Sequence, residues 1–459
     1  MTDIPRRAIS RTVKLAGLPL GAAGRAAVGA GRRIGGEPAA AISSELQRRT
    51  AEQLFSVLGE LKGGAMKVGQ ALSVLEGALP EELVEPYREA LTKLQDSAPP
   101  MPEPSLRSVL AQSLGEDWER HFRSFAMAPA ACASIGQVHR AIWSDGREVA
   151  VKVQYPGAGP ALVGDFRRLA LVARVSWGWL PGIDLGPLLD ELIRRVEDEL
   201  DYAREARHQQ RFADTFAGDP LVVVPAVVHQ AGAVLVTEWL DGESLSSIAA
   251  TGDLARRRQA ASAYLTFLLS GPQRARLLHA DPHPGNFRLT ADGRLGVLDF
   301  GAVDPLPDGL PAALGEILCC VLADDAAGLT DCLRQEGFVR QDAKADPARL
   351  LDLIAPFAEP LRGPEFTFTR EWLRSLTARF AEPGRNTVQL GRQLHLPPKY
   401  LLIHRVWLGG IGVLCQLDAP VPAHRTVARW LPAFAPAAED GQVHPGSRAG
   451  LPAATVEPR

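Results

Sequence analysis

The sequence predicts an α+β protein with two lobes, a small β-rich N-lobe and a larger helical C-lobe. Two observations lead to this fold class. Strand-like stretches at residues 135–142 and 148–153 flank the turn Ser144-Asp145-Gly146, which is typical of a β-hairpin. From Pro305 to about Trp430, apolar residues recur mainly at helical spacing. Strands early in the chain and helices later favour separate β-rich and helical parts.

Composition excludes several classes of protein. The chain has 459 residues, a formal net charge of −3 and five cysteines. A slightly acidic balance argues against a general nucleic-acid partner. An odd cysteine number without a CxxC pair favours a reduced, cytoplasmic setting. No apolar stretch reaches the ~18 to 20 residues of a membrane span, and 406–417 is expected to be a core helix.

The first 42 residues form a basic segment with two open interpretations. Through Gly36 it carries six arginines and one lysine against the single acid Asp3, with leucines and alanines between them. It is either a basic amphipathic segment on an anionic membrane surface or a solvated, partly disordered tail. The first interpretation predicts peripheral attachment at the inner face of the membrane.

Helical spacing predicts an extension over residues 43–104. Its second helix carries Lys67-Val68-Gly69-Gln70, and helix-breaking residues close it at 97–104. We then expect the N-lobe over 105–240, the C-lobe over 241–435, and a disordered Pro/Ala/Gly-rich tail over 436–459.

A lysine and an acidic helix form the first candidate site. Lys152 ends Val149-Ala150-Val151-Lys152, the pattern of a strand lysine that contacts nucleotide phosphates. A long helix predicted from 186 to 212 carries Glu199, Asp201 and Glu205. Asp201 and Glu205 stand one turn apart and repel unless a cation intervenes, and Lys152 is the natural candidate. The alternative is an acidic face neutralised by arginines of the same helix.

A second candidate site lies in the stretch from His279 to Phe300. Asp281 precedes Asn286 by five residues and Asp299 by eighteen, and Phe300-Gly301 completes Asp-Phe-Gly. This is the order of a catalytic aspartate that accepts a hydroxyl proton and two hard oxygen ligands for Mg²⁺. A hairpin over 287–298 is expected to bring Asn286 and Asp299 close together. The alternative is a zinc site, because His279, Asp281 and His283 occupy alternate positions.

Two further stretches are expected to contact a nucleotide. Where a glycine-rich phosphate loop is expected, the chain has an alanine-rich one with Ala131, Ala133 and Ser134, and the methyl groups restrict backbone approach to phosphate. Strands predicted at 221–228 and 233–239 then lead to Glu238, where a hinge between lobes can bind an adenine ring.

Together these motifs resemble the AarF/UbiB family of atypical, protein-kinase-like proteins, which includes the coenzyme Q8-type proteins. The resemblance covers residues 45 to 420, with Lys67–Gln70 for the family's KxGQ, 131–137 for its alanine-rich loop and Glu199–Asp201 for its ExD. It implies a bilobal protein-kinase-like fold with a helical extension packed over the cleft. Cys132 departs from the loop pattern, and the C-terminus lacks the apolar spans that some bacterial members carry.

The resemblance also implies functions for individual residues. It implies ATP and Mg²⁺ as cofactors, and an ATPase or a small-molecule or lipid-directed kinase that supports isoprenoid quinone or lipid metabolism. A lipid or quinone precursor is the expected partner, no oligomeric state is predicted, and protein-kinase activity is not expected. One alternative is a nucleotide-gated pseudokinase scaffold; another is a protein kinase in which Lys67 and Gln70 leave the cleft. The candidate catalytic residues are Asp281, Lys152 and Glu205, and the candidate metal ligands are Asn286 and Asp299. The candidate nucleotide-binding residues are Ala131, Ala133, Ser134 and Lys152, together with Glu238 from its place at the expected hinge. The resemblance implies a regulatory role for Lys67, Gln70, Glu199 and Asp201.

Overall fold

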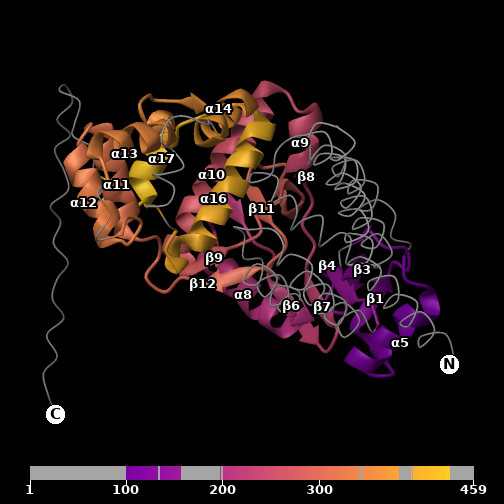
Figure 1. The fold of residues 1–459 in the computed structure, drawn as a ribbon. Helices are drawn as coiled ribbons and strands as arrows, with labels where there is room; N and C mark the ends of the chain where they lie inside the picture. The colour runs from indigo at the N-terminus through magenta and orange to yellow at the C-terminus, as the bar shows by residue number, and fades with distance from the viewer. Residues whose placement is uncertain are drawn as a thin grey trace, which may run out of the picture.

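The structure is a computed structural model, and it describes residues 100–132, 135–156, 197, 200–340, 343, 345–381, 394 and 396–434. Within this part of the chain the predicted α+β fold class is confirmed. A sheet-rich N-lobe lies at one end and a helical C-lobe at the other (Figure 1). The basic segment, the extension up to residue 99, most of 157–199 and the tail lie outside the described residues, so their predictions stay predictions.

The N-lobe is built on a six-stranded sheet of order β1-β3-β4-β7-β6, with β2 paired to β3. The predicted hairpin is confirmed: β3 and β4 pair from Gly136 opposite Gln154 to Ile142 opposite Glu148. Gly146 closes its turn with φ of +100°, a conformation that glycine adopts without strain. The strands are β1 (Phe122–Phe125), β2 (Ala131–Cys132), β3 (Gly136–Trp143), β4 (Glu148–Gln154), β6 (Val227–Ala231) and β7 (Val234–Glu238).

Strand alternation decides which side chains of β4 are available for chemistry. Val149, Val151 and Val153 are fully buried and pack in the core beneath α5 (Glu103–Leu114) and the 3₁₀ helix η1 (Trp118–His121). Since successive side chains of a strand point to opposite faces, Lys152 points to the other face, toward α8 (Tyr202–Thr215).

The C-lobe surrounds two long helices that pack against each other, α10 (Leu254–Ala275) and α16 (Pro398–Leu417) (Figure 1). Its largest sheet has the order β5-β11-β10-β8, and two strand pairs, β12-β9 and β13-β14, lie beside it. The remaining elements are β5 (Val222–Val223), β8 (Glu243–Ser244), α9 (Leu245–Thr251), β9 (Leu277–His279), η2 (Pro284–Asn286), β10 (Phe287–Leu289), β11 (Leu295–Val297), β12 (Val303–Pro305), α11 (Ala312–Leu322), α12 (Ala326–Gln335), α13 (Pro347–Ile354), η3 (Ala355–Leu361), β13 (Phe366–Thr367), α14 (Arg370–Ala381), β14 (Pro420–Val421) and α17 (Ala423–Trp430).

Helix α16 is longer than the sequence indicated. It has 20 residues and, by length and composition, is the one described helix that could cross a membrane. The expected core role is consistent with its packing, since its buried face lies on α10 and 44% of its apolar window is buried. A core helix passes the same test of length and hydropathy.

Two predicted elements are interrupted, and each break has a local cause. The predicted continuous helix through Asp201 is wrong: Asp201 is the N-cap of α8, and its Oδ1 accepts the backbone N–H of Arg204 at 2.9 Å. The single strand predicted over 221–228 is also wrong. It divides at Pro225, which has no N–H to continue a ladder. The residues before Pro225 form β5 and pair with β11, whereas those after it form β6 and pair with β7.

Candidate active site

The ion pair expected between β4 and the acidic helix is formed. Lys152 Nζ lies 2.6 Å from Glu205 Oε1 and 3.8 Å from Asp299 Oδ2. The side chain of Glu205 is 2% exposed and that of Lys152 is 17% exposed. Burial by itself would lower the pKa of Lys152, but the negative charges of Asp299 and Glu205 outweigh it and the pKa is raised. The ammonium therefore stays charged at neutral pH and links the two lobes. The alternative of an acidic face neutralised by arginines is not needed for Glu205.

Asp299 is held by the turn that it begins. Its Oδ1 accepts the backbone N–H of Gly301 at 2.9 Å, and its side chain is 39% exposed. Phe300 is fully buried and contacts Phe212 of α8 at a ring-centroid distance of 5.0 Å. The Asp-Phe-Gly turn thus anchors its phenylalanine beneath α8 while the carboxylate stays accessible beside Lys152.

His279 holds the backbone of Asp299. Its Nε2–H donates to the Asp299 carbonyl at 2.6 Å, and its ring lies in an aromatic cage that includes Phe267 and Phe300. Burial lowers the pKa of His279, so the imidazole is neutral and the donor nitrogen is assigned by the carbonyl that it contacts. The sequence interpretation considered His279 only as a metal ligand. The available signal was its position two residues before Asp281, as in the kinase His-Arg-Asp motif.

The zinc alternative for His279, Asp281 and His283 is wrong. His279 is committed to Asp299, and Nδ1 of His283 accepts the backbone N–H of Gly285 at 3.1 Å. Across the residues that the structure describes, no three His, Cys, Asp or Glu side chains are grouped to hold a metal ion.

Two helices, α10 and α16, contact the loop that carries Asp281. Tyr264 of α10 donates its hydroxyl to the Pro282 carbonyl at 2.8 Å, and burial raises the pKa of that hydroxyl, assisted by the charge of Asp281. A Cβ on Gly409 of α16 would lie only 2.6 Å from Pro282 Cγ. Glycine at 409 therefore lets α16 pack directly against the loop. Neither Tyr264 nor Gly409 was singled out from the sequence, because each is distant from Asp281 along the chain.

Asn286 is oriented as a metal ligand would be. Its Nδ2 donates to the Asp281 carbonyl at 3.4 Å, which leaves Oδ1 as the free end of the amide. The hairpin of β10 and β11 is formed as predicted, and its backbone joins Asn286 to the residue before Asp299 through a 3.0 Å hydrogen bond from Leu298 N–H. One amide oxygen and one carboxylate are the hard donors that Mg²⁺ prefers, so these residues fit the ion.

The described part of the alanine-rich loop folds back on β3. Ala131 and Cys132 form the exposed strand β2, whereas Ala133 and Ser134 lie outside the described residues. The loop ends at Gly136, to which the sequence interpretation gave no role. A Cβ on Gly136 would overlap the Val153 carbonyl and lie 3.0 Å from the Tyr202 hydroxyl. The Tyr202 ring in turn lies 5.2 Å from Lys152 Nζ.

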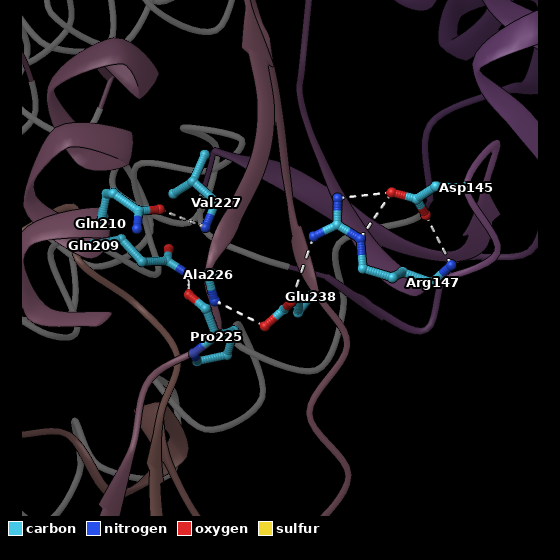
Figure 2. A network of polar contacts seen from close by, with 8 residues as sticks. All are labelled: Asp145, Arg147, Gln209, Gln210, Pro225, Ala226, Val227 and Glu238. Carbon is cyan, nitrogen blue, oxygen red and sulfur yellow. Dashed lines mark hydrogen bonds and ion pairs between the residues drawn. The ribbon is translucent and has the colours of Figure 1, made fainter. Parts of the chain in front are cut away.

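Glu238 lies at the end of β7, where residues 239–242 connect the N-lobe sheet to β8. We call these four residues the hinge. The carboxylate of Glu238 accepts the backbone N–H of Ala226 at 3.2 Å and lies 3.5 Å from Arg147 (Figure 2). Its side chain is thus engaged with protein, so an adenine ring would have to contact backbone groups of the hinge rather than the Glu238 carboxylate.

The remaining predicted site residues divide in two groups. Asp201 is described, and it caps α8 rather than extending a helix. Lys67, Gln70 and Glu199 lie outside the described residues, so their regulatory assignment stays a prediction.

Comparison with known proteins bears directly on this arrangement. The ABC1 atypical kinase-like domain matches residues 93–333, which is more than half of the chain. The chain belongs to the ABC1 atypical kinase-like family. The family resemblance drawn from the motifs is therefore confirmed, and so is the kinase-like class of fold.

Named relatives come from mitochondria, chloroplasts and bacteria. The atypical kinase coq-8, mitochondrial, of Caenorhabditis elegans is 31% identical over 315 residues, covering 66% of this chain and 41% of its own. The chloroplastic protein ACTIVITY OF BC1 COMPLEX KINASE 1 of Arabidopsis thaliana is 29% identical over 378 residues, covering 80% of this chain and 53% of its own. An uncharacterized Synechocystis protein is 32% identical over 391 residues, covering 81% and 64%. The chain thus spans less than two thirds of these relatives.

A solved structure shows a similar fold. It is titled as the complex of Rv3197 with erythromycin from Mycobacterium tuberculosis. It is 40% identical to this chain, covers 86% of this chain and 99% of its own, and has a TM-score of 0.67.

Proposed function

We propose that this protein binds MgATP in the cleft between its lobes and uses it as an ATPase or as a kinase of a small molecule or lipid. The observation that supports this most directly is the three-residue cluster of Lys152, Glu205 and Asp299, with separations of 2.6 and 3.8 Å from the ammonium. An active kinase needs the strand lysine paired with the helix glutamate and the Asp-Phe-Gly aspartate beside it.

Each residue has a distinct proposed part in the reaction. Lys152 would hold the α- and β-phosphates, with Glu205 keeping its ammonium directed into the cleft. Asn286 and Asp299 would hold Mg²⁺, which bridges phosphate oxygens and neutralises their charge. Asp281 would orient the attacking hydroxyl or water and accept its proton. Its partial exposure and its braced loop suit a base that must meet a substrate.

The alanine-rich loop and the named relatives both bear on the class of phosphoryl acceptor. Ala131 and its alanine-rich loop restrict the backbone near the phosphates, which disfavours ordinary protein phosphorylation. Because relatives are named as COQ8-type atypical kinases, we place the activity in isoprenoid quinone or lipid metabolism, with peripheral contact at the inner face of the membrane.

Phosphate release from MgATP tests the proposal. We expect turnover by the wild-type chain, with an increase on anionic liposomes, and its loss in Asp299→Asn. Calorimetry with MgATP measures nucleotide binding alongside turnover. If the wild type shows no Mg²⁺-dependent nucleotide binding, the proposal is refuted.

A nucleotide-gated scaffold is the second candidate, favoured by the exposed alanine-rich strand at 131–132. It predicts that Asp281→Asn preserves function in a cell that depends on this protein, whereas Lys152→Met and Asp299→Asn abolish it. If all three substitutions abolish cellular function equally, the scaffold hypothesis is refuted and the enzyme hypothesis remains. A macrolide is a further ligand to include in the binding assay, since the 40% identical chain is titled as an erythromycin complex.

A further inference from the structure

Two segments connect the N-lobe sheet to the sheet that leads to Asp299. One is the hinge, and the other is residues 224–227, which lead from β5 into the first residue of β6 and which we call the crossover. Glu238 fastens the two together. Its backbone N–H donates to the Ala226 carbonyl at 3.0 Å. Its Oε2 accepts the Ala226 N–H at 3.2 Å, as Figure 2 shows. Both polar backbone groups of Ala226 are therefore bound by Glu238, the residue immediately before the hinge.

Helix α8 binds the crossover one residue earlier. Gln209 Nε2 donates to the Pro225 carbonyl at 2.8 Å, and the Gln209 side chain is buried (Figure 2). Pro225 has no N–H, so this carbonyl is its one backbone hydrogen-bonding group. Gln209 also lies four residues after Glu205, one turn along the same buried face of α8. A shift of α8 that moved Glu205 away from Lys152 would therefore also break the bond to Pro225.

We propose that Gln209 and Glu238 are positioning residues that couple the hinge to Glu205 through the crossover. In this arrangement Glu238 binds Ala226 of the crossover, and the Pro225 carbonyl of the crossover binds Gln209. Gln209 thereby keeps α8 in the position where Glu205 reaches Lys152. The inference rests on the proposed function, because the position of α8 matters for activity only if the Lys152–Glu205 pair orients a nucleotide. Arg147, which pairs with Glu238 at 3.5 Å, adds little since both side chains are more than 40% exposed.

The first test measures the Lys152–Glu205 pair without any nucleotide. The full chain is treated with an amine-reactive acylating reagent, and the rate at Lys152 is followed by peptide mass spectrometry. We expect Gln209→Met to raise that rate about fivefold or more, because the Pro225 carbonyl loses its buried donor.

The matched control is Gln210→Met. Gln210 is the same residue type on the same helix, and its Oε1 accepts the Val227 N–H of the crossover at 3.0 Å. Gln210 lies on another face of α8 from Glu205 and is only half-buried. The acylation rate of Lys152 in Gln210→Met should therefore stay within about twofold of the wild-type rate. Equal rates for Gln209→Met and wild type, or equal increases in both variants, would refute the coupling.

A second variant separates the hydrogen bond from packing. In Gln209→Glu, a protonated carboxyl can donate to the Pro225 carbonyl, whereas an ionised one cannot. Burial favours the protonated form, so the acylation rate relative to Gln210→Glu should fall as the pH is lowered from 8 to 6. A ratio that does not change with pH would exclude the hydrogen bond as the cause.

The hinge end is tested with Glu238→Met, which removes the acceptor for Ala226. It should raise Lys152 acylation as Gln209→Met does, and the double variant should exceed the larger single effect by less than about twofold. In MgATP turnover, Gln209→Met should lower kcat about tenfold while KM changes less than threefold. If the wild type binds no MgATP, the proposed function fails and the acylation rates still decide the coupling. If the wild type turns over MgATP and Gln209→Met behaves as wild type, the coupling alone fails.

Discussion

Replacing Glu205 by glutamine removes one negative charge from the buried partner of Lys152 and keeps its shape. At 2.6 Å, with an effective dielectric constant of about 20, the Coulomb attraction to the ammonium is about 6 kcal/mol before desolvation. The contribution of Asp299 at 3.8 Å is about 4 kcal/mol before further screening, because its side chain is 39% exposed. Losing one partner of a buried pair costs about 3 to 5 kcal/mol.

We expect the lower end of that range for Glu205→Gln. Burial raises the pKa of Glu205 even with Lys152 beside it, so burying its carboxylate is costly and a neutral amide avoids that cost. The glutamine carbonyl can still accept from Lys152, and Asp299 remains as a carboxylate, so the free energy of unfolding should fall by no more than about 3 kcal/mol. If the same energy is lost from the transition state, turnover falls about 100-fold. Denaturant unfolding by circular dichroism measures the first quantity, and steady-state phosphate release measures the second.

Glu148→Gln is the matched control for burial. Glu148 lies 2.7 Å from Arg140, but about half of each side chain is exposed, so its substitution should leave stability and turnover unchanged. A second comparison pairs Lys152→Met with Glu205→Leu, which should restore stability without restoring turnover. The reasoning is refuted if Glu205→Gln and Glu148→Gln have the same effect on unfolding.

Further predictions concern the supports of the cleft. Gly409→Ala should lower turnover at least tenfold, because its Cβ would lie 2.6 Å from Pro282 Cγ and displace the Asp281 loop. The control is Gly412→Ala on the same helix, where the space around the Cβ is open. It should add about 0.5 to 1 kcal/mol of stability and leave turnover unchanged. Equal turnover in the two alanine variants would contradict the close packing. Burial lowers the pKa of His279 in the folded protein below its unfolded-state pKa of about 6.5. The stability that depends on the neutral imidazole is therefore fully present above pH 6.5, and it is lost as the pH falls from the unfolded-state pKa toward the folded-state pKa. His279→Gln keeps a donor for the Asp299 carbonyl and cannot titrate, so the variant should lose less stability than wild type between pH 7 and 5, and parallel pH profiles would exclude His279 as the cause.

Much of the site was predictable because its residues are close in sequence. The hairpin β3–β4 and the hairpin β10–β11 each follow from a glycine turn between alternating strands, and both formed as predicted. Local turns and strand periodicity depend on neighbouring residues, so they can be inferred without a tertiary structure. Lys152 could be assigned to the face opposite the apolar residues of its strand for the same reason.

Where local signals competed, the sequence interpretation was wrong. Apolar spacing favoured one helix through Asp201 and one strand through Pro225, but the aspartate capped a new helix and the proline ended the strand. In both cases a single residue with a strong backbone preference outweighed the periodicity around it. His279 also belonged to the fold rather than to a metal, because its environment is created by aromatic residues from distant elements.

By itself, the sequence determined the α+β fold class, the order of the motif residues and the hard-oxygen chemistry of Asn286 and Asp299. Only the tertiary structure decided that Glu205 pairs with Lys152, 53 residues away, rather than with arginines of its own helix, and that Gly409 of α16 packs on the Asp281 loop. The physical reason is that such contacts depend on how α8 and α16 pack, and that packing is set by many weak apolar contacts among residues far apart in the chain.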